Sequence, residues 1–260
     1  MFKECRARGS LYGAACLFAA LLIMATSAAR GAELRVLCVV ALKSAMTELG
    51  PQFEKASGHK LVVEYGTAGA VTERIGRDKG SDVAISARQQ IASLEDNGKI
   101  VNGTAVDVAR FGVGVFVRKG AAKPDISSVD AFKRTLFLAK SIAHADPARG
   151  GVTAIYVAKL LSGLDIAAEI KPKITVFPPG VYDSVANGLV EIGFGGISEI
   201  LADSSVEFAG PLPTAIQNYT VFAGGIVANA DQYAAGKALL EFISSPAAAA
   251  VMRAKGFEPL

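Results

Sequence analysis

Four short loops of the sequence combine small residues with a few polar or charged ones, a pattern suited to binding an anion. The loops span residues 40–44, 66–70, 146–153 and 195–199. Each loop leads into a segment with helical spacing, and the first N–H groups of a helix have no partner within it, so they can point at a negative charge. Small residues also make tight turns, which is the plainer interpretation of any single loop. The four loops together favour a binding cleft.

Backbone amides, hydroxyls and cations in and beside these loops are the groups that we predict to contact a ligand. The candidate ligand-binding residues are Ala41, Leu42, Lys43, Thr67, Ala68, Gly69, Arg88, Arg149, Gly151, Val152, Thr153, Tyr182, Ile197 and Ser198. Arg88 and Arg149 carry most weight, because a guanidinium can hold a planar carboxylate through two parallel hydrogen bonds. Both arginines, like Lys43, also have a plainer interpretation as solvated side chains.

Other chemistries find no support in the sequence. It contains no phosphate-binding P-loop, no cluster of Cys, His and acidic residues with metal-ligand spacing, and no Ser, His and Asp in the order of a catalytic triad. His59 follows a glycine in a turn and is expected to be exposed, whereas His144 lies in a strand and is expected in the core. We therefore expect neither a metal ion nor a cofactor.

The N-terminal residues 1–31 have the organisation of a secretory signal. Lys3, Arg6 and Arg8 supply a positively charged start, an apolar run follows at 11–24, and small residues then offer a cleavage site. The apolar run is shorter than the roughly 20 residues that cross a bilayer, which argues against a membrane anchor. We expect export to the periplasm and no stable membrane insertion after cleavage.

The formal net charge of +3 belongs to this leader. Residues 1–31 hold four basic residues and one acidic residue, so the remaining chain has 23 of each and is formally neutral. A neutral chain is poorly suited to nucleic acid or another polyanion. Once Cys5 and Cys16 have left, Cys38 has no disulfide partner, and its apolar neighbours predict a buried strand position rather than a reactive thiol.

Alternating strand-like and helical patterns predict a mostly parallel sheet covered by helices in the first part of the remaining chain. Strands are expected at 34–40, 60–65 and 82–86, and helices at 44–55, around 71–75 and at 89–97. The run at 34–40 is continuously apolar, as in a strand that is buried on both faces.

Two longer apolar segments, 108–117 and 219–228, are long enough to cross between two lobes. The alternation continues with helices at 126–139, 153–161, 181–187, 197–202, 231–243 and 246–255 and with strands at 141–145, 174–177 and 192–194. Asp231 is a suitable N-cap for the helix that follows it. We therefore predict a monomeric α/β protein, with lobe I at 32–112 plus 226–260 and lobe II at 113–225.

The order of several short motifs resembles that of the periplasmic molybdate-binding proteins. The motifs are Ala-Leu-Lys-Ser-Ala-Met at 41–46, Gly-Thr-Ala-Gly at 66–69, Ser-Asp-Val-Ala-Ile-Ser-Ala at 81–87, an Asp-Pro loop at 146–147 followed by Tyr156, and Ser-Pro-Ala-Ala at 245–248. The resemblance extends over the chain after the leader. It implies a two-lobed periplasmic-binding-protein fold of type II, with a mostly parallel sheet and flanking helices in each lobe, and an ABC permease as partner.

Departures from that family concern the groups that hold the anion. Where the family has a serine in each of the first two loops, this chain has Ala41 and Ala68, and Arg88 stands where the family has an acidic residue. Each lost donor costs about 0.5–1.5 kcal/mol, and arginine favours planar carboxylates. We therefore predict capture of a small anion, preferably a di- or tricarboxylate, for ABC transport.

Two alternatives stay open. The chain also resembles aconitate isomerases, periplasmic enzymes that interconvert cis- and trans-aconitate by removing one allylic proton and returning another. For that reaction the sequence offers several groups but marks none as activated: Lys43, Thr153, Tyr156, Tyr182, Ser198 and Glu199. The second alternative is an oxyanion such as molybdate, held by backbone amides alone.

Overall fold

Parallel strands joined by helices form the first part of the fold, as the alternating sequence pattern predicts. The computed structural model describes residues 31–77 and 80–260, of which Ala32–Leu260 form a single compact unit. Except for Gly31, the leader predicted at 1–31 lies outside the described residues. Within the described part, no helix is both long enough and apolar enough to cross a membrane.

Three strands and three α-helices alternate in this first part. They are β1 (Glu33–Val39), α2 (Lys43–Ser57), β2 (Lys60–Gly66), α3 (Ala68–Arg77), β3 (Val83–Ala87) and α4 (Arg88–Asp96). β1 lies between β2 and β3 and is parallel to both, with Val36 opposite Val63 and Val83. One short turn, η1 (Val40–Leu42), leads from β1 into α2. The carboxyl ends of these strands therefore meet at one edge of the sheet, where helices begin.

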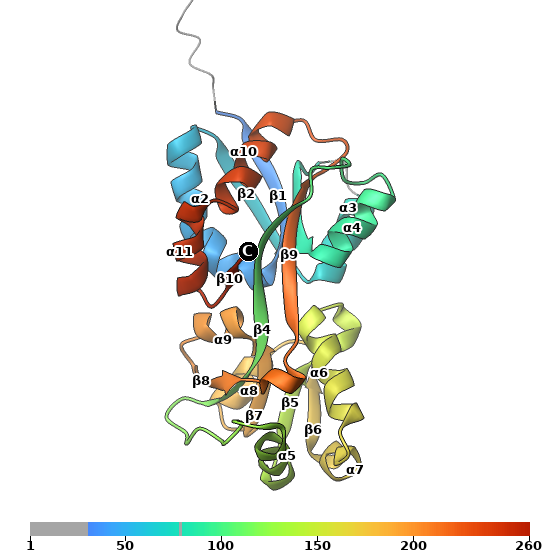
Figure 1. Ribbon diagram of the computed structural model, residues 1–260, viewed down its shortest axis with the longest axis vertical. Helices are drawn as coiled ribbons and strands as arrows, with labels where there is room; N and C mark the ends of the chain where they lie inside the picture. Colours follow the sequence, from blue (N-terminus) through green and yellow to red (C-terminus); the bar gives the residue numbers. More distant parts are fainter. Residues whose placement is uncertain (1–30, 78–79) are drawn as a thin grey trace, which may run out of the picture. The chain divides into compact units, whose positions relative to one another are not determined.

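The remaining elements continue the alternation and add antiparallel strands. They are β4 (Val106–Arg118), α5 (Val129–Leu138), β5 (Ile142–Ala145), η2 (Pro147–Arg149), α6 (Val152–Gly163), α7 (Ala167–Ile170), η3 (Lys171–Lys173), β6 (Ile174–Phe177), α8 (Val181–Ala186), β7 (Ile192–Gly196), α9 (Ile197–Ala202), β8 (Val206–Pro211), η4 (Thr214–Ile216), β9 (Tyr219–Ile226), α10 (Tyr233–Ile243), α11 (Pro246–Ala254) and β10 (Glu258–Pro259). The strand order is β2-β1-β3-β9-β4-β7-β5-β6, and β8 and β10 also pair with β4. Figure 1 shows α2, α10 and α11 on one side of the first part and α3 and α4 on the other.

The long strands β4 and β9 connect the two parts of the sheet (Figure 1). They are antiparallel to each other, with Phe111 opposite Thr220. The first half of β4 also pairs with β10, whereas the second half, from Val113 onward, pairs with β7 and β8. The structure therefore confirms long strands at the two segments that the sequence predicts to cross between lobes.

Separate clusters of buried side chains stabilise the two parts of the sheet. One cluster draws its buried residues from 34–111 and 222–257. Two further clusters draw theirs from 113–212. Along the chain, buried residues of the first cluster give way to those of the other two after residue 111 in β4, and they return at residue 222 in β9. These positions lie close to the predicted lobe boundaries at 112/113 and 225/226. The boundaries themselves stay predictions.

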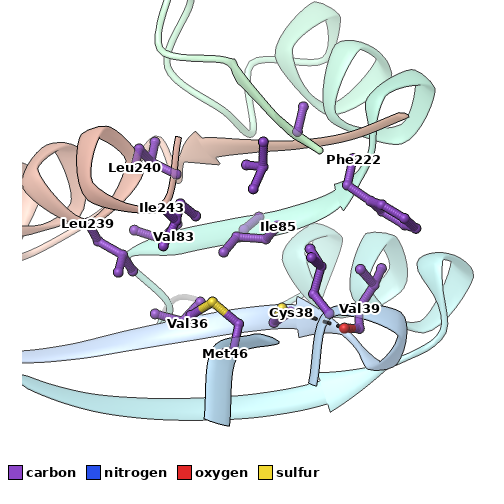
Figure 2. Packing of buried hydrophobic residues seen from close by; sticks show 14 of the residues in the cluster. Val36, Cys38, Val39, Met46, Val83, Ile85, Phe222, Leu239, Leu240 and Ile243 are labelled. Atoms are coloured by element: carbon purple, nitrogen blue, oxygen red, sulfur yellow. Dashed lines mark hydrogen bonds between the residues drawn. The ribbon is translucent and has the colours of Figure 1, made fainter. Parts of the chain in front are cut away.

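Cys38 is fully buried in the first cluster, as its apolar neighbours predict (Figure 2). Its Sγ lies 3.5 Å from the carbonyl oxygen of Val39. Burial raises the pKa of the thiol far above its ordinary value, because a thiolate would lose its hydration there. The side chain therefore behaves as a small apolar residue of the core rather than as a nucleophile.

The start of α10 corrects the capping role that was predicted for Asp231. The helix begins at Tyr233, its N-cap is Gln232, and no side chain caps it locally. Instead, the buried carboxylate of Asp82 accepts a hydrogen bond of 2.9 Å from the backbone N–H of Gln232, and another of 2.9 Å from the N–H of Arg35. Asp82 therefore holds the residue before α10, while the helix itself has no side-chain cap.

Other differences concern shorter elements. The helix predicted at 126–139 begins only at Val129, because Ser128 caps it by accepting a hydrogen bond of 3.1 Å from the N–H of Ala131. The elements α7, β8 and β10 were not predicted. α7 and β10 are too short to show a clear period in their sequences. β8 contains Gly210 and ends in Pro211, both of which are unfavourable in strands.

Candidate functional site

A cavity of about 150 Å³ lies where strands of both parts of the sheet end and helices begin. Its wall comes from β1, β2, β5 and β7, from the long strands β4 and β9, and from the first turns of α3, α6, α8 and α9. The lining residues are Val39, Val40, Ala41, Gly66, Thr67, Ala68, Phe111, His144, Ala145, Gly151, Val152, Thr153, Ala154, Val157, Val181, Tyr182, Phe194, Gly195, Glu199 and Phe222. Ligand sites of open α/β sheets occupy this kind of position.

Few of the lining side chains are polar. Those with polar atoms are Thr67, His144, Thr153, Tyr182 and Glu199. Among the described residues that form the wall, none is Lys or Arg. An anion in this cavity would therefore depend on these side chains and on backbone N–H groups.

Glu199 is the acidic side chain of the wall and lies in the first turn of α9. Burial raises the pKa of its carboxyl group from 4.5 to about 7, because the charged form loses hydration, while a hydrogen bond from the backbone N–H of Gly196 partly opposes this. Gly196 is also needed for space, since a Cβ there would lie 2.9 Å from Glu199 Oε2. The carboxyl group is therefore able to gain or lose a proton near neutral pH.

Tyr182 brings a buried hydroxyl to the same wall. Its ring stacks on Phe116, with 4.6 Å between centroids and 4° between planes. The hydroxyl oxygen is buried and has no hydrogen-bond partner. Burial raises the pKa of the phenol well above 10, and the charges of Glu199 and Asp203 add to the rise. The group is thus a neutral donor without an acceptor.

One of the two histidines is buried as predicted, and the other is less exposed than predicted. His144 of β5 is buried as predicted, its Nδ1 lies 2.8 Å from the carbonyl oxygen of Ala145, and it also lines the cavity. His59, predicted to be exposed, is half-buried, because its Nδ1 accepts a hydrogen bond from the N–H of Ala32 and its ring stacks on Phe53. Over residues 31–77 and 80–260, no three His, Cys, Asp or Glu side chains are grouped to hold a metal ion.

Hydrogen bonds join the two parts of the sheet beside the cavity. The hydroxyl of Thr67 donates to the carbonyl oxygen of Arg149 at 2.7 Å, and the N–H of Gly69 donates to the carbonyl oxygen of Gly150 at 3.2 Å. The backbones approach closely here, since a Cβ on Gly69 would lie 3.2 Å from the Cα of Gly150. A third bond, of 3.1 Å, runs from the buried hydroxyl of Ser198 to the carbonyl oxygen of Ala41.

A second cavity, of about 580 Å³, shares part of its wall with the first. Val40, Ala41 and Glu199 line both cavities. The other lining residues of the second cavity are Lys43, Ser44, Thr47, Ser198, Ala202, Asp203 and Ser204. Glu199 therefore borders both the inner, mainly apolar cavity and the outer, more polar cavity.

The structure brings together about half of the residues that were predicted to bind a ligand. Those that line the first cavity are Ala41, Thr67, Ala68, Gly151, Val152, Thr153 and Tyr182. Lys43 and Ser198 line the second cavity, Leu42 is buried in the core, Gly69 packs on Gly150, and Ile197 begins α9. A ligand contact of any of these residues stays a prediction.

The two arginines that carried most weight do not line either cavity. Arg88 forms an ion pair with Asp107, with 2.7 Å between Nη1 and Oδ1. Arg149 ends η2, and its backbone carbonyl oxygen, not its guanidinium group, accepts the hydrogen bond from Thr67. Their guanidinium groups are thus not among the described groups of the wall, and contact with a ligand stays a prediction for both.

Of the groups considered as bases, Thr153, Tyr182 and Glu199 line the first cavity. The hydroxyl of Tyr156 donates to the carbonyl oxygen of Ile216 at 2.6 Å and is not part of the wall. Sequence reasoning missed His144 and the aromatic wall of Phe111, Phe194 and Phe222, because an apolar residue inside a strand gives no sign of whether it faces a cavity or the core.

Comparisons with known proteins agree with this architecture. The family model of the bacterial extracellular solute-binding proteins matches residues 34–258. An aconitate isomerase from Pseudomonas sp is 31% identical over 235 residues, which cover 87% of this chain and 88% of that protein. A molybdate-binding protein from Azotobacter vinelandii is 26% identical over 237 residues, covering 88% of this chain and 91% of that protein.

Solved structures are similar in fold. The substrate-binding domain of a putative molybdenum ABC transporter from Clostridium difficile superposes with a TM-score of 0.71 at 19% identity, covering 88% of this chain and all of that chain. The strand order, the two crossing strands and the cavity at the helix starts therefore belong to a periplasmic-binding-protein fold. With a family model that spans nearly all described residues, this chain is a member of the bacterial extracellular solute-binding protein family.

Proposed function

We propose that the protein binds a small anion, preferably a di- or tricarboxylate, in the first cavity, and that it does so in the periplasm for an ABC transporter. The observation that carries the proposal is the hydroxyl of Tyr182, buried in the cavity wall without a hydrogen-bond partner. Such a group costs about 1–3 kcal/mol and is uncommon in native proteins, and an oxygen of a ligand would satisfy it.

Helix starts supply further donors for an anion. α3 and α6, of 10 and 12 residues, begin at the cavity with Ala68 and Val152. The first N–H groups of a helix lack acceptors within it, and the helix dipole adds partial positive charge at that end. At α3 the N–H groups of Gly69 and Ala70 already donate to Gly150 and Thr67. The start of α6 and the hydroxyls of Thr153 and Tyr182 therefore supply most of the donors for an anion, although the wall carries no Lys or Arg among the described residues.

The preference for a carboxylate rests on sequence differences and on one relative. Ala41 and Ala68 line the cavity where the molybdate-binding proteins, which the sequence resembles, carry serines. The relative that is 31% identical is named for aconitate, a tricarboxylate. The second cavity adjoins the first at Val40, Ala41 and Glu199, which offers room for a ligand longer than a tetrahedral oxyanion.

Ligand binding would hold the two parts of the sheet together, with β4 and β9 near the pivots. The bonds from Thr67 to Arg149 and from Ser198 to Ala41 support this, since each connects the two parts beside the cavity. An ABC permease is the expected partner of the loaded, closed form.

A thermal-shift screen of the chain from Ala32 onward tests the proposal. The panel contains citrate, both aconitates, other di- and tricarboxylates, molybdate, tungstate and sulfate. A ligand at 100 times its Kd stabilises a protein by about 2.7 kcal/mol, so we expect a carboxylate to raise Tm by about 5–10 °C. A rise with molybdate, tungstate or sulfate alone would contradict the preference for a carboxylate and support the oxyanion alternative.

A second candidate function is isomerisation of aconitate in the same cavity. Glu199 favours it, because a carboxyl group with a pKa of about 7 can both take up and return a proton at neutral pH. The base would remove a proton from the CH₂ group of aconitate, the double bond would move to the carbon that lost it, and the carbon at the other end of the allylic unit would gain a proton. The reaction needs no redox partner.

Proton NMR in D2O separates the two candidate functions. Interconversion of cis- and trans-aconitate with uptake of deuterium would contradict a pure binding protein. Stable binding without conversion or exchange would contradict the isomerase. If conversion is observed, Glu199→Gln serves as the control. Loss of the carboxyl group should abolish conversion, whereas the amide N–H group of glutamine can still donate to the ligand and allow binding.

A further inference from the structure

The first cavity is expected to bind an anion, although its wall contains a carboxyl group. This group belongs to Glu199, Tyr182 and His144 line the cavity as well, and none of its described lining residues is Lys or Arg. Around Glu199 on the outer side, Lys43 and Asp203 line the second cavity and carry opposite charges. The surroundings of Glu199 therefore hold no excess of positive side-chain charge that would offset both its carboxylate and a ligand.

Just after α9, Lys119 donates from Nζ to the carbonyl oxygen of Ser204 at 3.0 Å and can offset one negative charge, whereas two other cations are held in ion pairs. Lys255, which follows α11, lies 3.0 Å from Glu48 of α2, and Arg110 of β4 lies 2.6 Å from Glu258 of β10. A carboxylate ligand beside an ionised Glu199 would place two negative charges in one site. When two carboxyl groups share a site in this way, their repulsion raises the pKa of one group, which then retains its proton. Binding with both groups ionised is thus strongly disfavoured.

We propose that the cavity takes up its carboxylate ligand together with one proton, which the carboxyl group of Glu199 holds and donates to the ligand in a hydrogen bond. The inference rests on the proposed function and adds a rule of selectivity to it. An anion whose oxygens are all acceptors needs the protonated Glu199. The buried hydroxyl of Tyr182 supplies a second donor in the same wall.

The second cavity gives Glu199 a route for this proton. Glu199 lines both cavities, so its carboxyl group can exchange a proton through the outer cavity while a ligand occupies the inner one. The hydroxyl of Ser44, which lines the outer cavity, is buried without a hydrogen-bond partner and is available to a water molecule there. The loaded protein holds one ligand anion and one proton, and this proton comes from solvent during loading only where Glu199 is ionised in the free protein.

The pH dependence of affinity follows from this uptake of a proton. In the free protein the pKa of Glu199 is about 7, and a bound anion raises it further because the negative charge favours the neutral acid. Below pH 7 the group already carries its proton, so affinity is nearly constant. Above pH 7 each loading event must take up a proton, and affinity falls by up to about tenfold per pH unit.

Isothermal titration calorimetry with trans-aconitate tests the inference at pH 6 and pH 8. At each pH, two buffers that differ in ionisation enthalpy, such as Tris or imidazole against HEPES or MES, report the number of protons taken up. We expect between about half and one proton per ligand at pH 8 and much less at pH 6, because the ligand's own carboxyl groups stay largely ionised in this range. Affinity should be lower at pH 8.

Two variants assign the proton to its site. Glu199→Gln retains a donor of similar size but cannot titrate, so its affinity for trans-aconitate should be the same at pH 6 and pH 8, without proton uptake. Glu169→Gln removes an exposed carboxyl group of α7 that lines neither cavity, and it should behave as the wild type. If Glu199→Gln does not fold, proton uptake by the wild type still decides.

Different results would overturn the inference and the proposed function. Tight binding of trans-aconitate with equal affinity at both pH values and no proton uptake would refute the inference while leaving anion binding intact. The same holds if Glu199→Gln keeps the pH dependence of the wild type. No binding of trans-aconitate, citrate or any other carboxylate at either pH would contradict the proposed function itself.

Discussion

The hydroxyl of Tyr182 occupies its place because residue 195 has no side chain. A Cβ on Gly195 would lie 2.3 Å from this oxygen, and one on Gly196 would lie 2.6 Å from the ring of Phe111. In the sequence these two glycines indicate only a turn before a helix. Tyr182 and Glu199 were both candidates there, but the sequence carries no sign that one hydroxyl is left unpaired or that one carboxyl group loses its hydration, since both depend on packing between distant segments.

Tyr182→Phe should weaken ligand binding without loss of stability. The change removes a buried donor that has no partner in the free protein, so the free energy of unfolding should stay equal or rise by up to about 1 kcal/mol. Affinity for the ligand found in the screen should fall about 3- to 10-fold. Urea unfolding and calorimetry measure the two quantities.

Tyr156→Phe is the matched control, with the opposite expectation. Its hydroxyl donates to the carbonyl oxygen of Ile216 at 2.6 Å and does not line the cavity. Stability should fall by about 0.5–1.5 kcal/mol and affinity should be unchanged. A loss of stability in Tyr182→Phe as large as in Tyr156→Phe would mean that the hydroxyl of Tyr182 has a partner in the free protein.

Glu199 should make the free protein less stable as pH rises from about 4.5 to 7. Its pKa is raised in the folded state, so the folded protein holds this proton over a range in which the unfolded chain has released it, and the stabilisation is lost as pH passes the folded pKa. Glu199→Gln should therefore be more stable than the wild type at pH 8, by about 1–3 kcal/mol, with little difference at pH 4.5. Urea unfolding at several pH values measures this, and equal stability of the two proteins at pH 8 would argue against a buried, ionised Glu199.

At the scale of elements, periodic segments were predictable and tertiary contacts were not. The apolar run of β1 and the helical spacing of α2 place both elements within a few residues of their observed bounds. The ion pair of Arg88 with Asp107 and the hydrogen bond from the N–H of Gln232, just before α10, to Asp82 join residues distant in the sequence, so no local pattern indicates them. The same reason explains why the sequence emphasised guanidinium groups that the cavity wall does not contain.

Thr67→Val should weaken ligand binding through the contact between two loops. The variant loses the hydrogen bond of 2.7 Å to the carbonyl oxygen of Arg149, which joins the two parts of the sheet beside the cavity. It also loses the bond of 3.1 Å that the hydroxyl accepts from the N–H of Ala70 at the start of α3. We expect about 5-fold lower affinity and a loss of about 1 kcal/mol in stability.

Thr67→Ser retains a hydroxyl for both bonds and should keep the affinity of the wild type. Thr72→Val provides a control within α3, since its hydroxyl donates to the carbonyl oxygen of Ala68 in the same helix and makes no contact across the cavity. Equal affinity of Thr67→Val and the wild type in calorimetry would show that the loop contact does not contribute to the bound state.

At the scale of the whole molecule, the resemblance to molybdate-binding proteins led to the correct fold. The order of motifs along the chain predicted a periplasmic-binding-protein fold with two crossing strands, and the strand order and the family comparison agree. The ligand does not follow from the fold, because one fold can host many different sites. In this chain the cavity wall contains Ala41 and Ala68 as well as Tyr182 and Glu199.

Binding of a small carboxylate in the first cavity can be measured by isothermal titration calorimetry. The chain from Ala32 onward is titrated at pH 6.5 with trans-aconitate, citrate and molybdate in parallel. We expect micromolar or tighter binding of one of the two carboxylates, with one site per chain, and no tight binding of molybdate. Micromolar binding of molybdate with no heat from either carboxylate would contradict it.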